Sequence, residues 1–379
     1  MSDRLSILHL AHVRWFNAEA QYALDLALEM RRQGHRVGFL AETASPAAAK
    51  AKEAGLQVFE EDGFGKKGAG SFSVLAAGHR LKLLLRSGGF DAVECHRPEG
   101  LPLIALACRL AAVPLVRVRG DMRPARRDPF NRWLHRRLLA AVVASNTAVE
   151  ARLRERLGPL PRLMTIHGGV DPERFTPEGP AAAVREDLGL PAHAFLVGIL
   201  GRLGSVKGHG DFLAAAREVL DAPTEAAFVV LAKEPSAREA ELRAEVDGDP
   251  LLRGRVGFLG HCPDLPAVLR AFDLGVVAST GSEANCRVGL EWMASGVALL
   301  ATRVGVLPDL VAEGETGHLV APGRPEALAE KIAALSARPS EARRLGAAAR
   351  RRVLDRFTLA RCAEAHAALL GSLRTGARP

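Results

Sequence analysis

The sequence SEANCRVGLEWMASG, residues 282–296, decides the fold of the second half of this chain. Residues 276–279 before it and residues 297–301 after it are short and mostly apolar, as strands buried on both faces of a parallel sheet are. The glycine at its end is typical of a helix C-terminus. The stretch therefore predicts a strand, a loop, a helix and a second strand, with Glu283 on the loop and Glu291 about two turns into the helix. Carboxylates at the carboxyl end of a parallel strand commonly face a ligand.

The composition indicates a globular protein with two domains. A length of 379 residues exceeds one ordinary domain, and 48% hydrophobic with 25% charged residues is enough for a substantial core. Aromatic residues make up only 5%, which argues against a nucleic-acid binder that stacks bases on exposed rings. The five cysteines are odd in number and form no CxxC pair, so we expect neither a disulfide framework nor a zinc site.

The positive charge is confined to the first half of the chain. Residues 1–166 contain 26 Lys and Arg against 16 Asp and Glu, a net of +10, whereas the remaining residues contain 25 against 27, a net of −2. Twelve of the arginines fall between residues 115 and 162, where there are four acidic residues. This arginine excess indicates either an anionic partner or an ordinary solvated face in an arginine-rich composition.

Short apolar runs alternate with segments of helical spacing along most of the chain. The alternation begins at residue 5 and is interrupted at residues 158–180, which contain five prolines and four glycines. A second series follows, and it ends with predicted helices at 325–336 and 340–370. This pattern predicts an α/β protein made of two Rossmann-like, doubly wound domains that face each other across a cleft.

The interruption sets the expected domain boundaries. The first domain is expected at residues 1–166 and the second at residues 167–356. The C-terminal helix, at about 357–379, is expected to pack back on the first domain.

A second glycine-rich loop also follows a predicted strand. It reads GRLGSVKG, residues 201–208, and it brings Arg202 and Lys207 to one turn. Such a loop before a helix suits a diphosphate, because backbone N–H groups and cations can approach the phosphate oxygens. It lacks the Gly-Lys-Ser/Thr spacing of a Walker A loop.

Five motifs together resemble one enzyme family. They are GRLGSVKG, SEANCRVGLEWMASG, TRVGVLPDLV, GETGHLV and, in the connection between the expected domains, HGGVDPERF. The combination resembles the retaining GT-B glycosyltransferases, and within them the large group 1 family of bacterial sugar transferases. The resemblance extends over essentially the whole chain.

This resemblance implies a role for each charged residue of the second half. Glu291 would accept hydrogen bonds from the ribose hydroxyls of a nucleotide sugar. Arg202 and Lys207 would hold the diphosphate and neutralise its charge as it leaves. Glu283 would contact hydroxyls of the transferred sugar.

The resemblance also implies contacts from the loop and the helix start. Backbone N–H groups of Asn285, Cys286 and Arg287 would bind the phosphate nearest the sugar, and the base would pack near His261. No metal or other cofactor is expected, because the two cations and the helix N-terminus supply the positive charge.

The first half departs from the family pattern at two places. In the family, the loop after the first strand usually carries paired glycines. Here it contains Phe16 and Asn17 instead. Because Asn17 tolerates left-handed backbone, the turn and its contact with the donor phosphate could persist. Arg119 stands where the family often places a histidine, and it cannot act as a base at pH 7. Either the leaving phosphate is the base, or His96 supplies a nearby polar group; His96 could equally be a hydrogen-bonded structural histidine.

The implied function is transfer of a sugar, with retention, from a UDP-sugar or other nucleotide-diphosphate donor to a glycan or lipid-linked acceptor, such as lipopolysaccharide core or another surface polysaccharide. The absence of a signal-peptide pattern predicts a cytoplasmic location. The Arg-rich region 117–137 would allow peripheral contact with an anionic membrane at its inner face.

Trp133 and Trp292 are expected in the core. Two alternatives stay open: a catalytically degenerate GT-B partner or binding protein, and a GT-B nucleotide-sugar epimerase.

Overall fold

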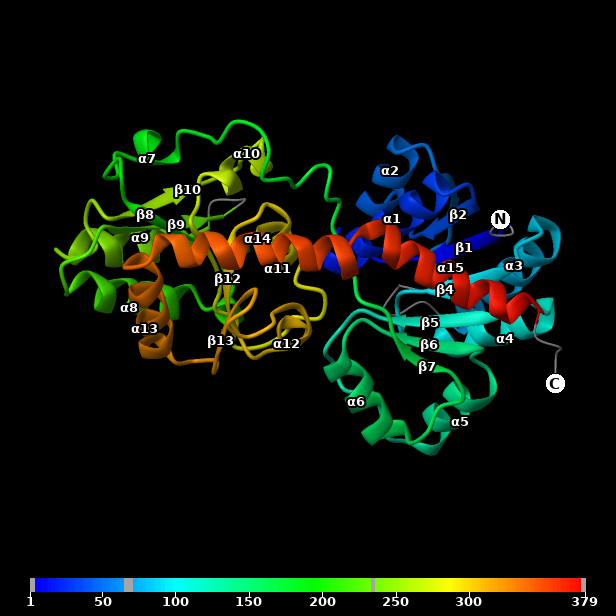
Figure 1. Ribbon diagram of the computed structural model, residues 1–379. Coiled ribbons are helices and arrows are strands. Elements are labelled where there is room, and N and C mark those ends of the chain that lie inside the picture. The colour runs from blue at the N-terminus through cyan, green and yellow to red at the C-terminus, as the bar shows by residue number, and fades with distance from the viewer. Residues whose placement is uncertain (1–3, 65–70, 233–235, 376–379) are drawn as a thin grey trace. The chain divides into compact units, whose positions relative to one another are not determined.

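The computed structural model describes residues 4–64, 71–232 and 236–375, and the chain divides into two compact units (Figure 1). Unit 1 consists of Met1–Gly168 together with Leu359–Pro379, and unit 2 is Gly169–Thr358. The division lies two residues after the boundary expected from the sequence.

Unit 1 is built on a parallel seven-stranded sheet with the order β3-β2-β1-β4-β5-β6-β7. Its elements are β1 (Ser6–Leu10), α1 (Ala18–Arg32), β2 (Arg36–Ala41), α2 (Pro46–Glu53), β3 (Gln57–Glu60), α3 (Ser71–Gly88), β4 (Ala92–Cys95), α4 (Leu101–Ala111), β5 (Leu115–Arg119), α5 (Pro129–Arg137), β6 (Ala141–Ala144), α6 (Thr147–Leu157), β7 (Leu163–Thr165) and α15 (Leu359–Thr375). The short edge strand β7 lies in the segment that the sequence predicted to be an interdomain connection.

Apolar cores lie on both faces of this sheet, as the near-continuous apolar strands predicted. One core is shared with α1, α2 and α15, and the other with α3, α4, α5 and α6. The strand order reverses between β1 and β4, and in a doubly wound sheet the crevice at that point, beyond the carboxyl ends of the strands, is the usual ligand position.

The C-terminal segment forms two helices, so the single helix predicted at 340–370 is wrong. α14 (Pro339–Arg356) belongs to unit 2, and α15 packs against α1 of unit 1. The break falls at Phe357, whose side chain is 1% exposed and whose carbonyl accepts a hydrogen bond from the Val170 N–H at 3.0 Å. Burial of Phe357 and this long-range hydrogen bond therefore end the helix.

Unit 2 is built on a parallel six-stranded sheet with the order β10-β9-β8-β11-β12-β13. Its elements are α7 (Val184–Asp187), β8 (Phe195–Leu200), the 3-10 turn η1 (Ser205–Lys207), α8 (His209–Leu220), β9 (Ala226–Leu231), α9 (Ala237–Gly248), β10 (Val256–Leu259), α10 (Leu265–Arg270), β11 (Leu274–Val277), α11 (Arg287–Ala294), β12 (Ala298–Thr302), α12 (Leu307–Leu310), β13 (Gly317–Val320), α13 (Pro325–Ser336) and α14. Both sheets confirm the predicted α/β class with two doubly wound domains.

Trp292 of α11 fixes that helix against the unit 2 sheet. Its ring is fully buried and lies edge-to-face with Phe272, with ring centroids 5.2 Å apart. A Cβ at Gly275 of β11 would lie 2.5 Å from the indole, so this strand must be bare at the point where the ring rests on it. The prediction that Trp292 is a core residue is confirmed.

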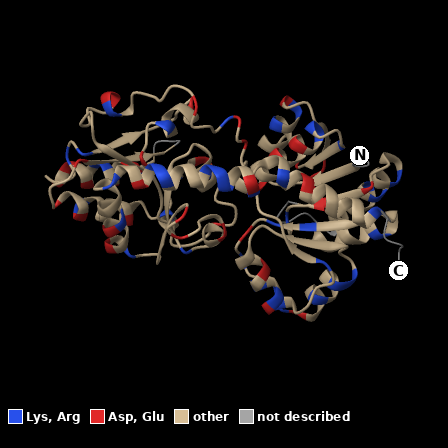
Figure 2. Cartoon of the chain, viewed as in Figure 1, with Lys and Arg blue, Asp and Glu red and all other residues tan. Residues whose placement is uncertain are grey.

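Arginines of unit 1 are concentrated in the segment that includes α5 and α6, where Figure 2 marks many Lys and Arg positions on the ribbon. In this segment Trp133 is 50% exposed, so its predicted place in the core is wrong. Its ring stacks instead on exposed Phe130, with ring centroids 5.9 Å apart. In the ranges that the structure describes, no helix is both long and apolar enough to cross a bilayer.

Candidate active site

The glycine-rich loop after β8 is held against the end of β11. Gly208 has φ +73°, and a Cβ there would lie 1.9 Å from the carbonyl oxygen of Ala278. The Thr280 N–H donates to the carbonyl of Val206 at 2.9 Å. This close approach of two backbones places Lys207 beside the loop that follows β11.

Glu283 lies at the centre of this arrangement and is 5% exposed. Its carboxylate forms an ion pair with the Lys207 ammonium and accepts a hydrogen bond from the Ser279 hydroxyl at 2.5 Å. Its backbone is fixed as well, since its carbonyl accepts from the Val306 N–H at 2.8 Å, and a Cβ at Gly305 would lie 1.8 Å from that carbonyl oxygen. Both ends of the residue are therefore held.

The loop leading into α11 has an unusual backbone. Ser282 and Cys286 adopt positive φ values of 63° and 35°, which are uncommon for residues other than glycine and concentrate at functional sites. Cys286 is the N-cap of α11 and provides no side-chain cap, so the first N–H groups of the helix are available. The Asn285 amide oxygen is buried without a hydrogen-bond partner among the described residues.

The environment of Cys286 shows that these groups converge. Burial raises the pKa of its thiol well above the usual range, and the nearby Glu283 carboxylate raises it further, whereas the Lys207 charge acts in the opposite direction. Lys207, Glu283 and the start of α11 therefore lie within electrostatic reach of one another.

Glu291 lies on α11 and is 6% exposed. Its carboxylate is 3.5 Å from the guanidinium of Arg287, one helical turn earlier. Because the next residue, Trp292, is anchored in the core, the position of Glu291 is set by packing rather than by the loop.

In unit 1, Asn17 caps α1. Its side chain accepts a hydrogen bond from the Ala20 N–H at 3.0 Å, and its backbone is extended, with φ −108°. Asn17 therefore does not use the left-handed backbone that it tolerates, because the capping hydrogen bond favours extended backbone at this position. Phe16 beside it packs against the core, and the Lys50 ammonium lies 4.9 Å from its ring centroid.

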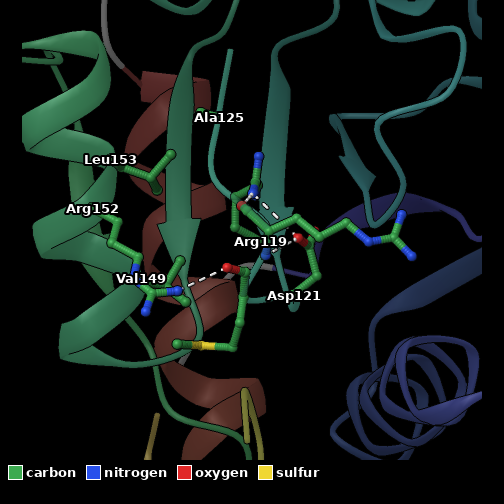
Figure 3. A pocket seen from close by; sticks show the side chains of 8 residues that line it. Arg119, Asp121, Ala125, Val149, Arg152 and Leu153 are labelled. Carbon is green, nitrogen blue, oxygen red and sulfur yellow. Dashed lines mark hydrogen bonds and ion pairs between the residues drawn. The ribbon is translucent and has the colours of Figure 1, made fainter. Parts of the chain in front are cut away.

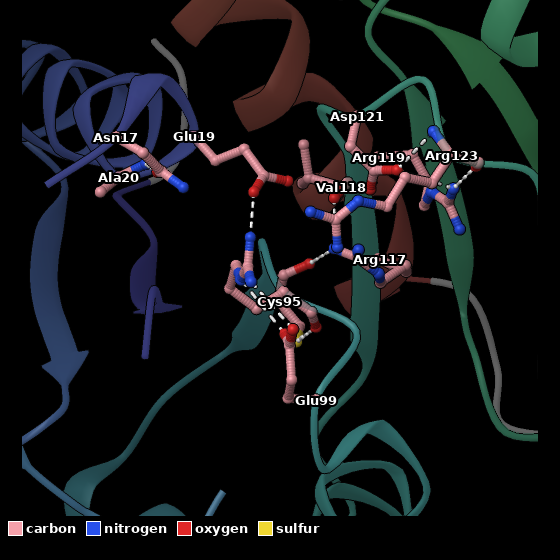
Figure 4. Close-up of polar contacts among 11 residues, drawn as sticks. Asn17, Glu19, Ala20, Cys95, Glu99, Arg117, Val118, Arg119, Asp121 and Arg123 are labelled. Atoms are coloured by element: carbon pink, nitrogen blue, oxygen red, sulfur yellow. Dashed lines mark hydrogen bonds and ion pairs between the residues drawn. The ribbon is translucent and has the colours of Figure 1, made fainter. Parts of the chain in front are cut away.

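A charged network that sequence reasoning missed lies at the carboxyl edge of the unit 1 sheet (Figure 4). The Arg97 guanidinium forms ion pairs with Glu19 and with Glu99. Burial raises the pKa of Glu19 despite the opposing effect of Arg97. Arg117 is fully buried, and one of its terminal nitrogens donates to the carbonyls of Cys95, at 2.7 Å, and of Val118. The arginines within an otherwise apolar strand, LVRVR at 115–119, were the available signal.

Arg119 lines a small hollow beside this network (Figure 3). It is 7% exposed, and its guanidinium donates to the Arg123 carbonyl at 2.6 Å and lies 3.3 Å from the Asp121 carboxylate. Arg152 of α6 also lines the hollow and donates to the Met122 carbonyl at 2.9 Å.

His96 belongs to a buried histidine network behind the sheet edge. A nitrogen of its ring lies 3.1 Å from one of the His9 ring, and burial, followed by the His9 ring, holds its pKa well below the usual range. Potential ligand atoms of His9, Glu94 and His96 lie within 4.8 Å of one another, so these three side chains could hold a metal ion. The hydrogen bonding and the burial are those of a structural histidine.

Two family models match the chain, one on each unit. The model described as glycosyl transferases group 1 matches residues 194–338, and that of glycosyltransferase family 4 matches residues 20–174. The chain is 33% identical over 270 residues to the lipopolysaccharide core biosynthesis mannosyltransferase LpcC of Rhizobium leguminosarum bv. viciae, which covers 70% of this chain and 73% of that protein. This chain belongs to the group 1 glycosyltransferases.

Other proteins similar to this glycosyltransferase agree with that family. It is 31% identical over 290 residues to D-inositol 3-phosphate glycosyltransferase 1 of Catenulispora acidiphila, covering 70% of this chain and 69% of that protein. Among solved structures, Anabaena HepE in complex with UDP and glucose has a TM-score of 0.79 at 22% identity and covers 97% of this chain and 100% of that chain. Sucrose-phosphate synthase of Thermosynechococcus elongatus has a TM-score of 0.76 at 19% identity, covering 97% and 98%. The fold is GT-B.

In this glycosyltransferase, two of the predicted site residues stand apart from the central group. Arg202 and His261 are exposed, and neither side chain forms a hydrogen bond or ion pair with another residue in the described ranges. Both follow strand ends of unit 2, at the same edge of the sheet as Lys207 and Glu283.

Proposed function

We propose that this glycosyltransferase transfers a sugar, with retention of anomeric configuration, from a nucleotide-diphosphate donor to a glycan or lipid-linked acceptor. UDP-sugar is the proposed donor, and lipopolysaccharide core or another surface polysaccharide is the proposed acceptor. The observation that carries this proposal is the convergence of Lys207, Glu283 and the uncapped start of α11 at one sheet edge. The names of two relatives point the same way, since HepE was solved with UDP and LpcC is a core mannosyltransferase.

The Lys207–Glu283 ion pair suggests how donor binding prepares the site. A diphosphate would compete with Glu283 for the Lys207 ammonium, because phosphate oxygens carry more charge than one carboxylate. Glu283 would then accept hydrogen bonds from hydroxyls of the donor sugar. The N–H groups of Asn285, Cys286 and Arg287 would bind the phosphate nearest that sugar, in line with the helix dipole.

Glu291 is assigned to the ribose hydroxyls, and His261 to the neighbourhood of the base. Arg202 and Lys207 would neutralise the leaving diphosphate, so we propose that transfer needs no metal ion. Full activity after treatment with EDTA would support this, and restoration of a lost activity by a divalent cation would contradict it.

The group that accepts the proton of the incoming hydroxyl is assigned to the departing phosphate of the donor. Arg119 cannot accept a proton at pH 7. His96 is engaged with His9 in the buried network. A phosphate oxygen leaving the same face of the sugar can accept the proton of the incoming hydroxyl, which gives retention.

The first experiment measures nucleotide affinity by calorimetry. Glu291→Gln should weaken UDP binding about tenfold or more, because two charge-assisted hydrogen bonds are lost. Glu330→Gln, which removes an exposed carboxylate of unit 2, is the matched control and should change affinity less than twofold. Unchanged affinity in Glu291→Gln would remove its assigned role.

The second experiment identifies the reaction. Proton NMR of the product should show the same anomeric configuration as the donor sugar. If the donor is incubated without an acceptor and the configuration at one of its ring carbons changes, the protein is instead an epimerase. Tight nucleotide binding with no turnover across donors and acceptors would identify a degenerate partner protein.

We further propose that the protein is cytoplasmic and contacts an anionic membrane surface through the region 117–137. Exposed Phe130 and Trp133 stand among the arginines of α5 and the preceding loop, a combination typical of helices that lie at a bilayer interface. Each exposed arginine near an anionic surface contributes about 1 kcal/mol, and the buried Arg117 and Arg119 are not among these.

Vesicle sedimentation tests this contact. The protein should bind phosphatidylglycerol vesicles more than phosphatidylcholine vesicles, and Trp133→Ser should reduce the bound fraction several-fold. Phe72→Ser removes a 90% exposed aromatic outside the Arg-rich region and serves as the control. Equal losses in the two variants would show that the Arg-rich region is not the contact surface.

A further inference from the structure

The hollow in unit 1 lies between the loop after β5 and helix α6, at the carboxyl edge of the sheet (Figure 3). Arg119, Arg123 and Arg152 line it together with one acid, Asp121, which gives a formal charge of +2. Because ligands of doubly wound sheets bind beyond the carboxyl ends of the strands, this position is a natural one for a substrate.

Three buried nitrogen atoms in this part of unit 1 have no hydrogen-bond partner among the described residues. They are the Arg119 Nε, the second terminal nitrogen of Arg117 and the His135 Nε2. These three residues are 7%, 0% and 4% exposed, respectively. Of the three residues, Arg119 lines the hollow, whereas Arg117 and His135 lie outside its lining. A buried guanidinium nitrogen without a hydrogen-bond partner is costly, so an acceptor brought to Arg119 would be stabilising.

Positive charge predominates around these nitrogens, although the Asp121 carboxylate lies 3.3 Å from the Arg119 guanidinium and Glu19 and Asp121 both oppose the charge of Arg117. Arg117 and Arg119 are two positions apart on β5, so both point to the same face of the sheet. Burial lowers the pKa of His135 to about 4, and the Arg117 and Arg119 charges lower it further, so the imidazole is neutral at pH 7. Arg117 donates to backbone carbonyls, which do not neutralise its charge. Asp121 is therefore the one carboxylate that lines a hollow with three arginines.

We propose that this hollow binds a phosphate group of the acceptor, with Arg119 and Arg152 as its direct ligands. Arg117, which does not line the hollow, adds positive charge to the electrostatic potential there. The assignment to the acceptor rests on the proposed function, which places the donor in unit 2. A phosphate dianion matches the charge of +2, and its oxygens can each accept from the fork of a guanidinium. A carboxylate would neutralise only half of that charge.

The test uses the full chain and inorganic phosphate as the probe. Arg202→Gln and Lys207→Gln are introduced together first, so that phosphate bound to the unit 2 loop does not contribute. In this background, calorimetry and the shift in melting temperature should show one phosphate site. Arg119→Gln should weaken it about tenfold, and Arg152→Gln severalfold, because each removes charge-assisted hydrogen bonds.

Arg137→Gln is the matched control, since it removes one exposed arginine of the same basic segment and should change phosphate affinity less than twofold. If Arg119→Gln does not fold, as judged by circular dichroism, Arg152→Gln decides, because Arg152 is exposed and its replacement should leave the fold intact. Equal weakening by Arg137→Gln and Arg152→Gln would show a diffuse charge effect and overturn the proposal. So would the absence of phosphate binding, or acetate binding as tightly as phosphate.

Two further probes identify the source of the phosphate. Glucose 1-phosphate binding more tightly than inorganic phosphate supports a phosphorylated glycan as the acceptor. Tighter binding of a short-chain phosphatidic acid, which carries a terminal phosphate like that of glucose 1-phosphate, supports a lipid-linked acceptor. UDP affinity is measured separately on the unsubstituted protein, so failure of the phosphate site and failure of the proposed donor site are distinguishable.

Discussion

Gly208 controls the geometry of the candidate donor site at the scale of a single residue. Its missing side chain allows the backbone after Lys207 to lie against the carbonyl of Ala278 at the end of β11. Any other residue would face both a steric overlap and an unfavourable positive φ. The same contact that packs the loop therefore aims the Lys207 ammonium at Glu283.

Gly208→Ala should destabilise unit 2 by about 2 kcal/mol or more, from left-handed backbone strain and displacement of the Ala278 carbonyl. UDP affinity should fall as well, because Lys207 moves with the loop. Urea unfolding and calorimetry measure the two effects. Gly204→Ala is the control, since Gly204 has φ −112° and no heavy atom within 4 Å of an added Cβ. An unchanged free energy of unfolding in Gly208→Ala would contradict this account.

The residues of the candidate donor site could be singled out from the sequence because their signals are local. Lys207 and Glu283 each stand in a short motif directly after an apolar strand, and the structure joins their side chains. The Arg97–Glu19 ion pair connects residues 78 positions apart, and no local sequence pattern predicts it. Arg117 was counted as one of many surface arginines, since composition cannot distinguish a buried guanidinium from a solvated one.

At the scale of an element, α15 is fixed to unit 1 by buried polar contacts in addition to apolar ones. The His366 Nδ1 lies 2.7 Å from the Glu94 carboxylate of β4, and its other nitrogen lies 3.1 Å from the Tyr22 hydroxyl of α1. The pKa of Glu94 is held at about 2 by the charge and hydrogen bond of His366, against the opposing effect of burial. His9 also lies 3.5 Å from this carboxylate, but burial lowers the pKa of His9 to about 4, so α15 carries the counter-charge of Glu94 at pH 7.

Replacing His366 with alanine should cost about 3–5 kcal/mol of stability, because it leaves the Glu94 charge buried without its partner. Hydrogen exchange should accelerate in α15 and at the β4 strand beside it. Glu364→Ala, an exposed change on the same helix, should alter stability by less than about 0.5 kcal/mol. Equal unfolding free energies for the two variants would show that the pair contributes nothing.

Two errors at this scale have tertiary causes. The break between α14 and α15 falls at Phe357–Thr358, where there is no glycine or proline to mark it. It arises from burial of Phe357 and from pairing with Val170, 187 positions earlier in the sequence. The sequence does not reveal which face of α5 is covered by other elements, so the expectation that Trp133 is buried was wrong.

At the scale of the whole molecule, the two units differ in their buried histidines. Burial lowers the pKa of His9, His12 and His135 in unit 1 to about 4, and that of His209 in unit 2 likewise. In each case the unfolded chain binds a proton near pH 6.5 that the folded chain does not bind until about pH 4. Acid therefore favours the unfolded state of unit 1 more strongly than that of unit 2.

Unit 1 should lose stability as the pH falls from 6.5 to 4, by up to about 1.4 kcal/mol per pH unit for each such histidine. On the alkaline side, the Glu94 charge raises the pKa of His366 to about 10 against the opposing effect of burial, so this contribution is fully present below pH 6.5 and is lost towards pH 10. Hydrogen exchange resolved by peptide, at pH 5, 7 and 9, measures both the acid and the alkaline loss of stability of unit 1. Faster acid opening of unit 2 than of unit 1 would contradict this prediction.

The overall architecture was predictable because apolar strands alternate with amphipathic helices along the sequence of both units. Charge was also informative at this scale, since the net of +10 in residues 1–166 corresponds to the unit that carries the arginine-lined hollow. The C-terminal helix was expected to pack back on the first domain, and α15 belongs to unit 1. The pair that anchors it, His366 and Glu94, joins residues 272 positions apart and emerges only in three dimensions.

The return of α15 to unit 1 has a consequence for how the protein is made. A ribosome releases the chain from its N-terminus, so all seven strands of the first sheet emerge long before Leu359 does. Until then Glu94 has no counter-charge and the apolar surface that α15 covers is bare. Unit 2, which is continuous in sequence, can complete its fold first, and the N-terminal unit is finished last.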